Sequence, residues 1–380
     1  MNLSDVPTPG LILDRRRLVA NTKGMAARIK AHGTALRPHA KTAKSAKIAC
    51  LATKSGTRSL AVSTLLEAEY FLDHGFKDLL YAVCIAPDKL DMAAALTNRG
   101  ADLKIIVDNP VAAAAISLHS EQHQVLLEID SGEHRTGVPL ESSQLLDLAR
   151  VVHDSGRSRV VGVLTHAGHS YSCQTASEAA KVAEGERRTA VDAAQILREA
   201  GYDTSIISVG STPTAIHGKS FEGVSEIRPG VYMFQDLFQA GIGSCRRDDL
   251  ALSVLATVIS SNSERKTLML DAGGLALSKD RSTEGTTFDA GYGLVADLRG
   301  DFIGDLRVNS VHQEHGQVMV SESKIFEQLP IGSKVRVFPN HACMTAAAYN
   351  TYYVIDGDTE VVETWPRCNG WPEKLLIDGV

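Results

Sequence analysis

Short apolar runs alternate with amphipathic segments over residues 12–243 of the chain. The segments show helical periodicity, and the longest opens with the capping box Thr175-x-x-Glu178 and closes at Gly201. The runs have the length and β-branched, mostly apolar character of strands buried on both faces. We expect eight strands, at residues 36–41, 59–64, 79–83, 103–107, 125–129, 160–165, 205–210 and 226–234. Eight alternating strand and helix units predict an α/β fold, a parallel (β/α)8 TIM barrel.

The pattern changes after residue 243. Further strand-like runs follow with no helical pattern between them, at residues 252–260, 267–271, 302–311, 316–320, 335–338 and 352–355. We therefore expect residues 12–243 to form the barrel, and residues 1–11 and 244–380 to form an all-β domain. The Gly-, Ser- and Thr-rich run at residues 278–293 predicts a long loop, and loops of that length often belong to a site.

Composition narrows the class of partner. The 380 residues carry a net charge of −6 from interspersed acids and bases, with no basic block, which argues against nucleic acid or an anionic membrane surface. No run approaches the length of a membrane helix, and the amino terminus lacks a secretory pattern. The six cysteines are scattered without a C-x-x-C pair, as in reduced cytoplasmic proteins. A small molecule is therefore the expected partner.

Lys41 is the first candidate for chemistry. It follows the first predicted barrel strand, and the carboxyl ends of barrel strands form the face on which such enzymes carry their sites. A lysine there can form a Schiff base with a carbonyl cofactor. The competing interpretation is a solvated helix face, because Lys41, Lys44 and Lys47 recur at every third residue. Spacing alone leaves both interpretations open.

The run at residues 208–214 is a candidate phosphate site. It follows the seventh predicted strand and precedes a short helix, so the backbone N–H groups and hydroxyls around Gly210, Ser211 and Thr212 can hold a phosphate. Gly230, in the predicted eighth strand, permits close approach of the backbone. The alternative is an ordinary Ser/Thr turn.

Polar and aromatic groups also follow strands five and six. Arg135 can hydrogen-bond a phenolate oxygen, His166 can pack flat on an aromatic cofactor, and Tyr171 lies five residues further on, with His134 and His169 nearby. A single histidine is more often structural, but several such groups on adjacent strand ends favour convergence on a ligand.

His341 and Cys343 form a candidate metal pair in the second domain. Residues i and i+2 of an extended chain point to one face, and an imidazole and a thiolate are good ligands for Zn²⁺. The spacing alone is a weak signal. His312 and His315 offer further polar groups, which the sequence does not identify as ligands.

Taken together, these segments resemble the D-serine dehydratase-like and D-threonine aldolase family of pyridoxal phosphate enzymes, which has the alanine racemase type of fold. The motifs that carry the resemblance are residues 37–42, 134–137, 165–168, 208–214, 313–316 and 339–343. The resemblance implies that Lys41 carries pyridoxal 5'-phosphate and that His341 and Cys343 hold Zn²⁺, with Mn²⁺ or Mg²⁺ as alternatives. It implies further contacts to the cofactor from Arg135, His166, Tyr171, Gly210, Ser211, Thr212, Gly230, Val231 and Tyr232.

The resemblance also implies an activity: a dehydratase of D-3-hydroxy amino acids such as D-threo-3-hydroxyaspartate or D-serine, giving a 2-oxo acid and ammonia, in a cytoplasmic homodimer. The alternative keeps cofactor and metal but cleaves the Cα–Cβ bond, giving glycine and an aldehyde. A racemase and a non-catalytic cofactor carrier are further alternatives. Relatives can carry tryptophan where this chain has Gly274, which puts the shape of the substrate pocket in doubt. Arg281 is a hypothetical partner for the substrate carboxylate.

Overall fold

The computed structural model describes residues 1–54, 56, 58–154 and 156–371. The chain divides into two compact units. One comprises Met1–Lys23 with Val231–Asn369, and the other comprises Gly24–Gly230 with a short piece that begins at Gly370. No helix among the described residues is long and apolar enough to cross a membrane.

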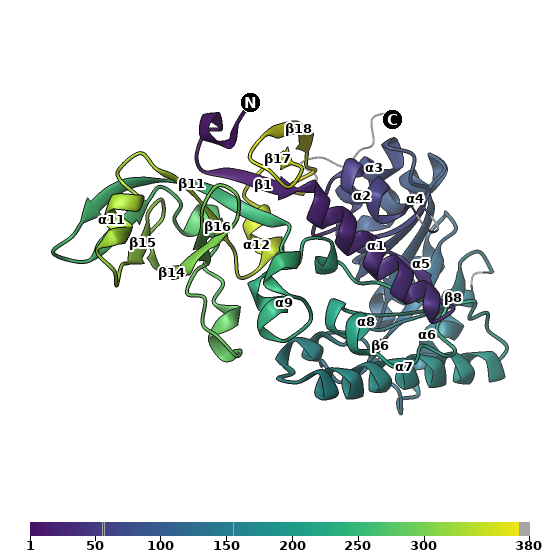
Figure 1. Ribbon diagram of the computed structural model, residues 1–380. Helices are drawn as coiled ribbons and strands as arrows, with labels where there is room; N and C mark the ends of the chain where they lie inside the picture. Colours follow the sequence, from purple (N-terminus) through teal and green to yellow (C-terminus); the bar gives the residue numbers. More distant parts are fainter. Residues whose placement is uncertain (55, 57, 155, 372–380) are drawn as a thin grey trace. The chain divides into compact units, whose positions relative to one another are not determined.

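The unit of residues 24–230 contains a parallel barrel (Figure 1). Its strands, in spatial order, are β2 (Ala35–Leu36), β10 (Glu226–Ile227), β9 (Ile206–Val209), β8 (Arg159–Leu164), β6 (Gln124–Asp130), β5 (Asp102–Val107), β4 (Asp78–Cys84) and β3 (Ser59–Val62). Neighbouring strands along this order are parallel. The predicted barrel and its eight strands are therefore confirmed in the described part of the chain.

Backbone hydrogen bonds beyond β2 close this ring. The N–H of Ala61 donates to the carbonyl of Pro38 at 3.0 Å, and the N–H of Ala40 donates to the carbonyl of Ala61 at 2.7 Å. On the other side, the N–H of His39 donates to the carbonyl of Pro229 at 2.9 Å. Pro38 and Pro229 have no N–H to donate, which explains why the regular strands end early. The run predicted at 226–234 accordingly stops at Ile227, and a 3-10 helix follows at Val231–Met233.

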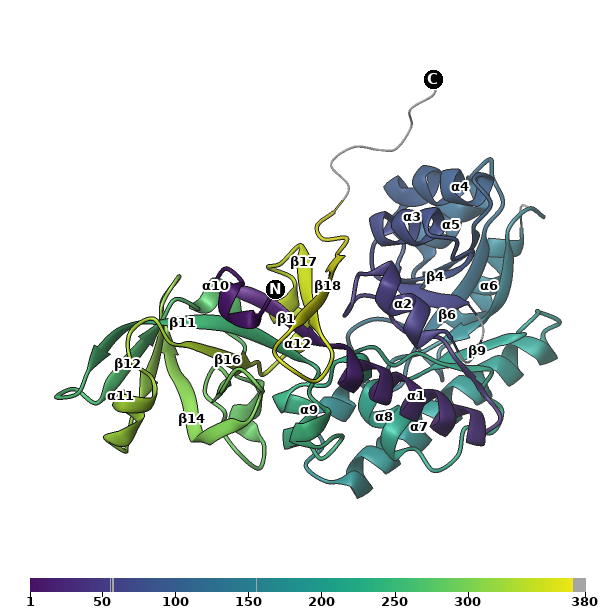
Figure 2. The same cartoon turned by 45° about the horizontal axis from the view of Figure 1, so that its top comes forward.

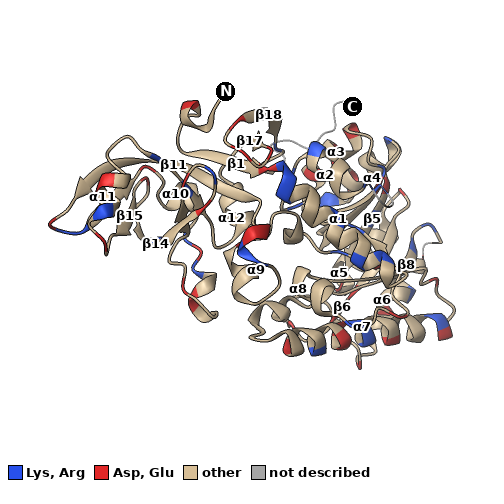
Figure 3. Cartoon of the chain, viewed as in Figure 1, with Lys and Arg blue, Asp and Glu red and all other residues tan. Residues whose placement is uncertain are grey.

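Helices alternate with the barrel strands as the periodicity predicts. They are α1 (Arg15–Ala31), α2 (Ala46–Ala52), α3 (Leu65–Asp73), α4 (Leu90–Asn98), α5 (Pro110–Leu118), α6 (Gln144–His153), α7 (Ala176–Glu199) and α8 (Thr212–His217). Acidic and basic residues are interspersed along α7 (Figure 3). Apolar side chains of the strands fill the interior of the barrel, where Leu80, Ile106 and Leu126 belong to one buried cluster.

The other unit is built on an antiparallel barrel (Figure 2). The order β12 (Thr267–Leu270), β15 (Gly316–Met319), β14 (Phe302–Val311), β13 (Leu294–Ala296), β16 (Lys334–Phe338), β11 (Leu252–Asn262) closes because β11 also pairs with β12. Beyond β11 the sheet continues through β1 (Gly10–Asp14), β17 (Thr351–Ile355) and β18 (Val361–Pro366). The short helices are α9 (Leu237–Gly241), α10 (Gly274–Leu277), α11 (Lys324–Gln328) and α12 (Ala342–Ala346). The predicted strands are present, and the pattern missed β1, β13 and β18.

Buried ion pairs cross the amino end of the parallel barrel. Arg37 is 4% exposed, and its guanidinium lies 2.7 Å from a carboxylate oxygen of Glu226 and 2.9 Å from one of Asp78. Lys104 adds a contact of 2.7 Å to Asp78. The buried cations Arg37 and Lys104 are therefore compensated by the buried Glu226 and by Asp78, whose side chain is 37% exposed.

We expect Arg37→Ala to lower the free energy of unfolding by about 3–5 kcal/mol, because it leaves the Glu226 carboxylate buried without its cation. Chemical denaturation measures this change. The matched control is Arg99→Ala, which removes a 44% exposed side chain that pairs with Glu69 and Asp73 and should cost less than about 1 kcal/mol. Equal losses in the two variants would contradict the prediction.

Candidate active site and metal centre

Lys41 lies in the turn after the barrel-closing segment. Its side chain is exposed, and the helix α2 begins only at Ala46. Lys41 and Lys44 therefore do not belong to a solvated helix face, and Lys44 instead forms a contact of 3.1 Å with the buried carboxylate of Glu67. The amine of Lys41 is accessible at the carboxyl end of the barrel strands, where a carbonyl compound could reach it.

The imidazole of His166 stands beside this lysine. Its Nδ1 lies 3.0 Å from the carbonyl oxygen of Gly210. Burial lowers the pKa of His166 to about 3, and the charges of Lys41, Arg135 and Arg228 act in the same direction, against the hydrogen bond to Gly210. The ring is therefore neutral, and since Gly210 accepts a proton from Nδ1, the lone pair is on Nε2.

A second buried imidazole belongs to the same group. Burial, followed by the charge of Lys41, lowers the pKa of His39 well below its usual value. Arg228 is buried beneath and donates to the hydroxyl of Ser208 and the carbonyl of Thr165, each at 2.7 Å. The charges of Lys41 and Arg228 thus help to lower the pKa values of two imidazoles, and both rings are neutral.

This arrangement fits an anionic aromatic cofactor such as pyridoxal phosphate. A phosphate and a phenolate would balance the cations Lys41, Arg135 and Arg228, and a neutral imidazole can pack against a ring. Gly230 supports the fit, because a Cβ at this position would lie 3.1 Å from the carbonyl oxygen of His39 and from the Thr42 hydroxyl. Only glycine allows the backbone to pass so close without moving its neighbours.

Two N–H groups of the predicted phosphate loop already donate hydrogen bonds within the chain. The N–H of Gly210 donates to Glu186 at 3.0 Å, and the N–H of Ser211 donates to the Thr214 hydroxyl at 2.9 Å. Ser211 is the N-cap of α8, so the run is an ordered cap and not an irregular Ser/Thr turn. A phosphate could replace the Thr214 hydroxyl on Ser211, since a charged acceptor binds an N–H more strongly. Thr212 is the first residue of α8.

The remaining predicted contacts lie in different places. Tyr171 is half-buried in the 3-10 helix Gly168–Ser172, close in sequence to His166. His134 is 82% exposed and bonds to Asp130 at 2.7 Å. Val231 and Tyr232 are buried residues of the β unit, and burial raises the pKa of Tyr232 above its usual value.

His341 and Cys343 lie at the start of α12, after β16. Asp280 of the long loop lies 2.8 Å from Nδ1 of His341. Burial lowers the pKa of His341, but Asp280 and Cys343 outweigh it and raise the pKa to about 11. With Nδ1 bonded to Asp280, Nε2 is the nitrogen that a metal would bind, and the metal would have to displace its proton. The donor set of one imidazole and one adjacent thiol therefore fits Zn²⁺.

Sequence reasoning missed the acids that support this pair. Asp236 is buried and accepts hydrogen bonds from the N–H groups of Gln239 and Ala342, each at 2.9 Å. Burial raises the pKa of Asp236 to about 6, against the charge of His341. Asp236 and Asp280 are far from His341 in sequence, so no local signal indicated them.

Arg281 is already engaged by acids of its own loop. Its guanidinium lies 3.0 Å from Asp289 and 3.5 Å from Glu284, and it stacks over the ring of Tyr292. These contacts engage the end of the guanidinium, while Nε is buried without a hydrogen-bond partner, so Arg281 as the partner of the substrate carboxylate stays a prediction.

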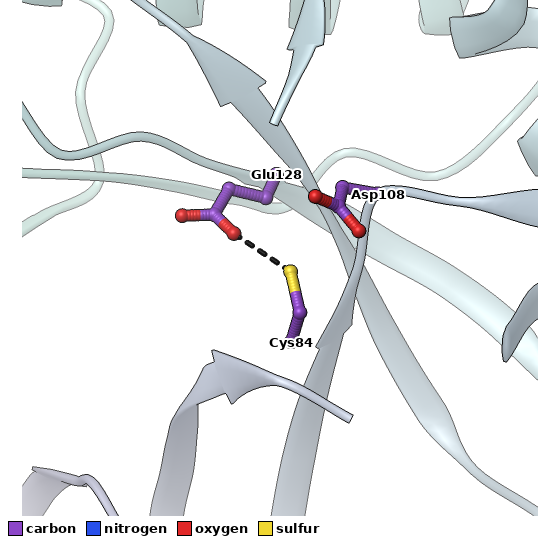
Figure 4. A group of neighbouring side chains, drawn as sticks. All are labelled: Cys84, Asp108 and Glu128. Carbon is purple, nitrogen blue, oxygen red and sulfur yellow. Dashed lines mark hydrogen bonds between the residues drawn. The ribbon is translucent and has the colours of Figure 1, made fainter. Parts of the chain in front are cut away.

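One further group in the described residues brings three potential metal ligands together, at the carboxyl ends of β4, β5 and β6 (Figure 4). The thiol of Cys84 donates to Glu128 at 2.8 Å, and Asp108 accepts from Asn109 and from the N–H of Gly137. Burial and the neighbouring carboxylates raise the pKa of Cys84, so the thiol keeps its proton. Hydrogen bonds within the chain are therefore enough to explain why these three side chains lie together.

A parallel barrel with a lysine at its mouth, followed by an antiparallel barrel, defines the alanine racemase class of pyridoxal phosphate enzymes. Comparison with known proteins gives the family. The domain described as "Alanine racemase, N-terminal domain" matches residues 13–237, and "Putative serine dehydratase domain" matches residues 251–355. The chain belongs to this family of pyridoxal phosphate-dependent dehydratases and aldolases, and it is a lyase.

Similar proteins cover nearly the whole chain. D-threo-3-hydroxyaspartate dehydratase of Delftia sp. (strain HT23) is 42% identical, covering 97% of this chain and 99% of the relative. D-threonine aldolase of Arthrobacter sp. is 30% identical, covering 94% and 92%. A solved structure of a cysteine-to-alanine variant of D-threo-3-hydroxyaspartate dehydratase in the metal-free form is 41% identical, with a TM-score of 0.94 and coverage of 98% and 100%.

We expect His166 to stay neutral between pH 5 and 8, since its pKa is about 3. Nitrogen-15 NMR of histidine-labelled protein should show one protonated and one bare ring nitrogen throughout, with the signal assigned by its loss in His166→Gln. Lys41→Met should raise this pKa, because it removes a cation that disfavours imidazolium. A wild-type titration midpoint at the usual value of a histidine would contradict the assignment.

Proposed function

We propose that this enzyme is a pyridoxal phosphate- and zinc-dependent dehydratase of a D-3-hydroxy amino acid. The expected substrates are D-threo-3-hydroxyaspartate and D-serine, and the expected products are a 2-oxo acid and ammonia. The observation that carries the proposal is the imidazole and thiol pair of His341 and Cys343, with Asp280 orienting the imidazole. The similarity to a dehydratase over nearly the whole chain supports it.

Lys41 is the proposed covalent attachment point for pyridoxal phosphate. Arg135, His166 and Tyr171 are proposed to contact its ring. The proposed contacts around its phosphate are Gly210, Ser211, Thr212, Gly230, Val231 and Tyr232. When bound, the cofactor supplies an electron sink for the pair left behind when the Cα proton is removed. Lys41 is the proposed base for that proton, because its amine would lie beside the bound cofactor.

The neutral imidazole of His166 has a positioning role in this scheme. Because its Nδ1 proton is committed to the carbonyl of Gly210, the ring cannot rotate freely and presents a fixed flat surface. A charged imidazolium at the same place would add to the cations already present and repel a protonated cofactor ring. Because the pKa of His166 is low, its ring would stay neutral in the proposed contact with the cofactor.

The metal is proposed to be Zn²⁺ on His341 and Cys343. A thiolate is a soft ligand that favours zinc, whereas Mn²⁺ and Mg²⁺ prefer oxygen ligands. A bound divalent ion supplies Lewis acidity to the substrate hydroxyl, which is a poor leaving group on its own. A dehydratase with a cysteine-to-alanine substitution has been solved in a metal-free form, which supports a thiol ligand in relatives.

Aldol cleavage is the second candidate, since a D-threonine aldolase is also similar over most of its length. The two reactions differ in which bond breaks at the hydroxyl-bearing carbon. Elimination breaks the C–O bond, which metal coordination of the oxygen assists directly. Cleavage breaks the Cα–Cβ bond and needs a base for the hydroxyl proton. The thiol ligand favours elimination. We further propose a cytoplasmic homodimer.

Incubating the protein with pyridoxal phosphate and D-threo-3-hydroxyaspartate, D-serine or D-threonine tests the function. We expect a yellow protein that releases ammonia and a 2-oxo acid, and a Lys41→Ala variant that stays colourless because it lacks the amine. EDTA should abolish activity while the visible absorbance remains, and added Zn²⁺ should restore it.

Other products identify the alternatives. Glycine with an aldehyde indicates cleavage, the L-enantiomer indicates a racemase, and no product from a yellow protein indicates a carrier. A wild-type protein that stays colourless with the cofactor would overturn the cofactor site. Activity that is indifferent to EDTA would overturn the metal site alone.

Asp280→Asn should weaken Zn²⁺ binding by about 10- to 100-fold, because second-sphere partners of metal-binding histidines have effects of this size. Competition with a chromogenic chelator measures the affinity. Asp289→Asn is the matched control, since Asp289 is a carboxylate of the same loop that pairs with Arg281 instead of His341. Unchanged zinc affinity in Asp280→Asn would show that this contact does not support the metal.

A further inference from the structure

Glu186 is a carboxylate buried behind the barrel mouth. It lies in the middle of α7 and is 1% exposed. A single oxygen, Oε1, accepts hydrogen bonds from the N–H groups of Ala167 at 2.8 Å and Gly210 at 3.0 Å. These two donors come from different loops, one after β8 and the other after β9. Glu186 therefore joins the two loops through one atom.

These loops carry many of the groups assigned to the cofactor. The first contains His166 and Tyr171, and the second contains Gly210, Ser211 and Thr212. Two further bonds cross between them: His166 to the carbonyl of Gly210 at 3.0 Å, and the hydroxyl of Ser170 to that of Ser211 at 2.8 Å. The Glu186 bonds lie next to the first of these, at Ala167 and Gly210. Loss of Glu186 would leave both N–H groups buried without an acceptor.

We propose that Glu186 is a positioning residue that fixes the His166 imidazole and the phosphate loop for cofactor binding, an inference that rests on the proposed function. The acceptor Oε1 performs this role, so a neutral carboxamide should replace the carboxylate. The side chain must be long enough to reach both loops from α7, since the N–H groups of Ala167 and Gly210 donate to the same oxygen.

The competing explanation is that Glu186 only stabilises the fold. Asp14 provides a matched comparison, because it is a 3% exposed carboxylate in the β unit whose Oδ1 accepts from the N–H groups of Arg16 at 3.0 Å and Arg17 at 3.2 Å. Asp14 is a carboxylate of similar burial that also contacts Arg17 through Oδ2 at 3.5 Å, and its partners belong to the first turn of α1 and to no predicted cofactor loop.

The test measures the dissociation constant of pyridoxal phosphate and the thermal midpoint of the full-length apoprotein for each variant. We expect Glu186→Ala to weaken cofactor binding by about 10- to 100-fold, the effect typical of lost second-sphere contacts. Glu186→Gln should bind within about threefold of the wild type, since it keeps the acceptor. Asp14→Asn and Asp14→Ala should lower the thermal midpoint without changing cofactor affinity.

Two outcomes would overturn the inference while the wild type still becomes yellow with the cofactor. Affinity within twofold of the wild type in Glu186→Ala means that the contact is only structural. Affinity in Glu186→Gln as weak as in Glu186→Ala means that the acceptor Oε1 is not what matters. If Glu186→Ala does not fold, Glu186→Asp takes its place, since its shorter side chain withdraws the acceptor. A colourless wild type instead overturns the proposed function.

Discussion

Closure of the parallel barrel by the segment after β2 is the constraint on which the site depends. The strand β2 is only two residues long. The segment after it is held by backbone hydrogen bonds of Ala40 and Ala61 on one side and of His39 on the other. Without these bonds the turn carrying Lys41 would have no fixed place. With them, Lys41 shares the carboxyl face with the ends of the other strands, as parallel topology requires.

The two ends of this barrel treat charge differently. At the amino end, Arg37 is matched by Glu226 and Asp78, so the network is self-contained. At the carboxyl end, Lys41, Arg135 and Arg228 lower the pKa of His166, while Arg135 contacts Glu133 at 3.4 Å and buried acids act on Arg228. The side chain of Lys41 is exposed at this end. The amino end is therefore held by ion pairs within the chain, whereas the carboxyl end presents an accessible amine beside a neutral imidazole, which suits the proposed cofactor site.

Periodicity predicted the barrel strands because each buried strand is a local apolar run, and the turn lysine because it follows such a run. It could not predict β13, which is three residues long. It also could not predict that the eighth strand ends at Ile227, shortly before Pro229. It also missed Asp280, Asp236 and Glu186. Their partners lie far away in sequence, and a polar residue in a helix or loop gives no sign of what it will face after folding. The predicted phosphate loop stays a prediction, and nothing in the local sequence indicates that the N–H of Gly210 donates to Glu186.

The long loop at residues 278–293 shows how tertiary contacts override composition. Its Gly, Ser and Thr content predicts a long loop, and tertiary contacts hold that loop in place. Asn340 bonds to the carbonyls of Asp280 at 2.9 Å and Gly291 at 2.6 Å and accepts from the Thr283 hydroxyl at 2.8 Å. Asn340 precedes His341, and Asp280 in turn holds the His341 ring. The two segments therefore fix each other by reciprocal bonds. The proposed ligand pair would therefore need little reorganisation on binding an ion, which would favour binding with fewer protein ligands than a closed structural site has.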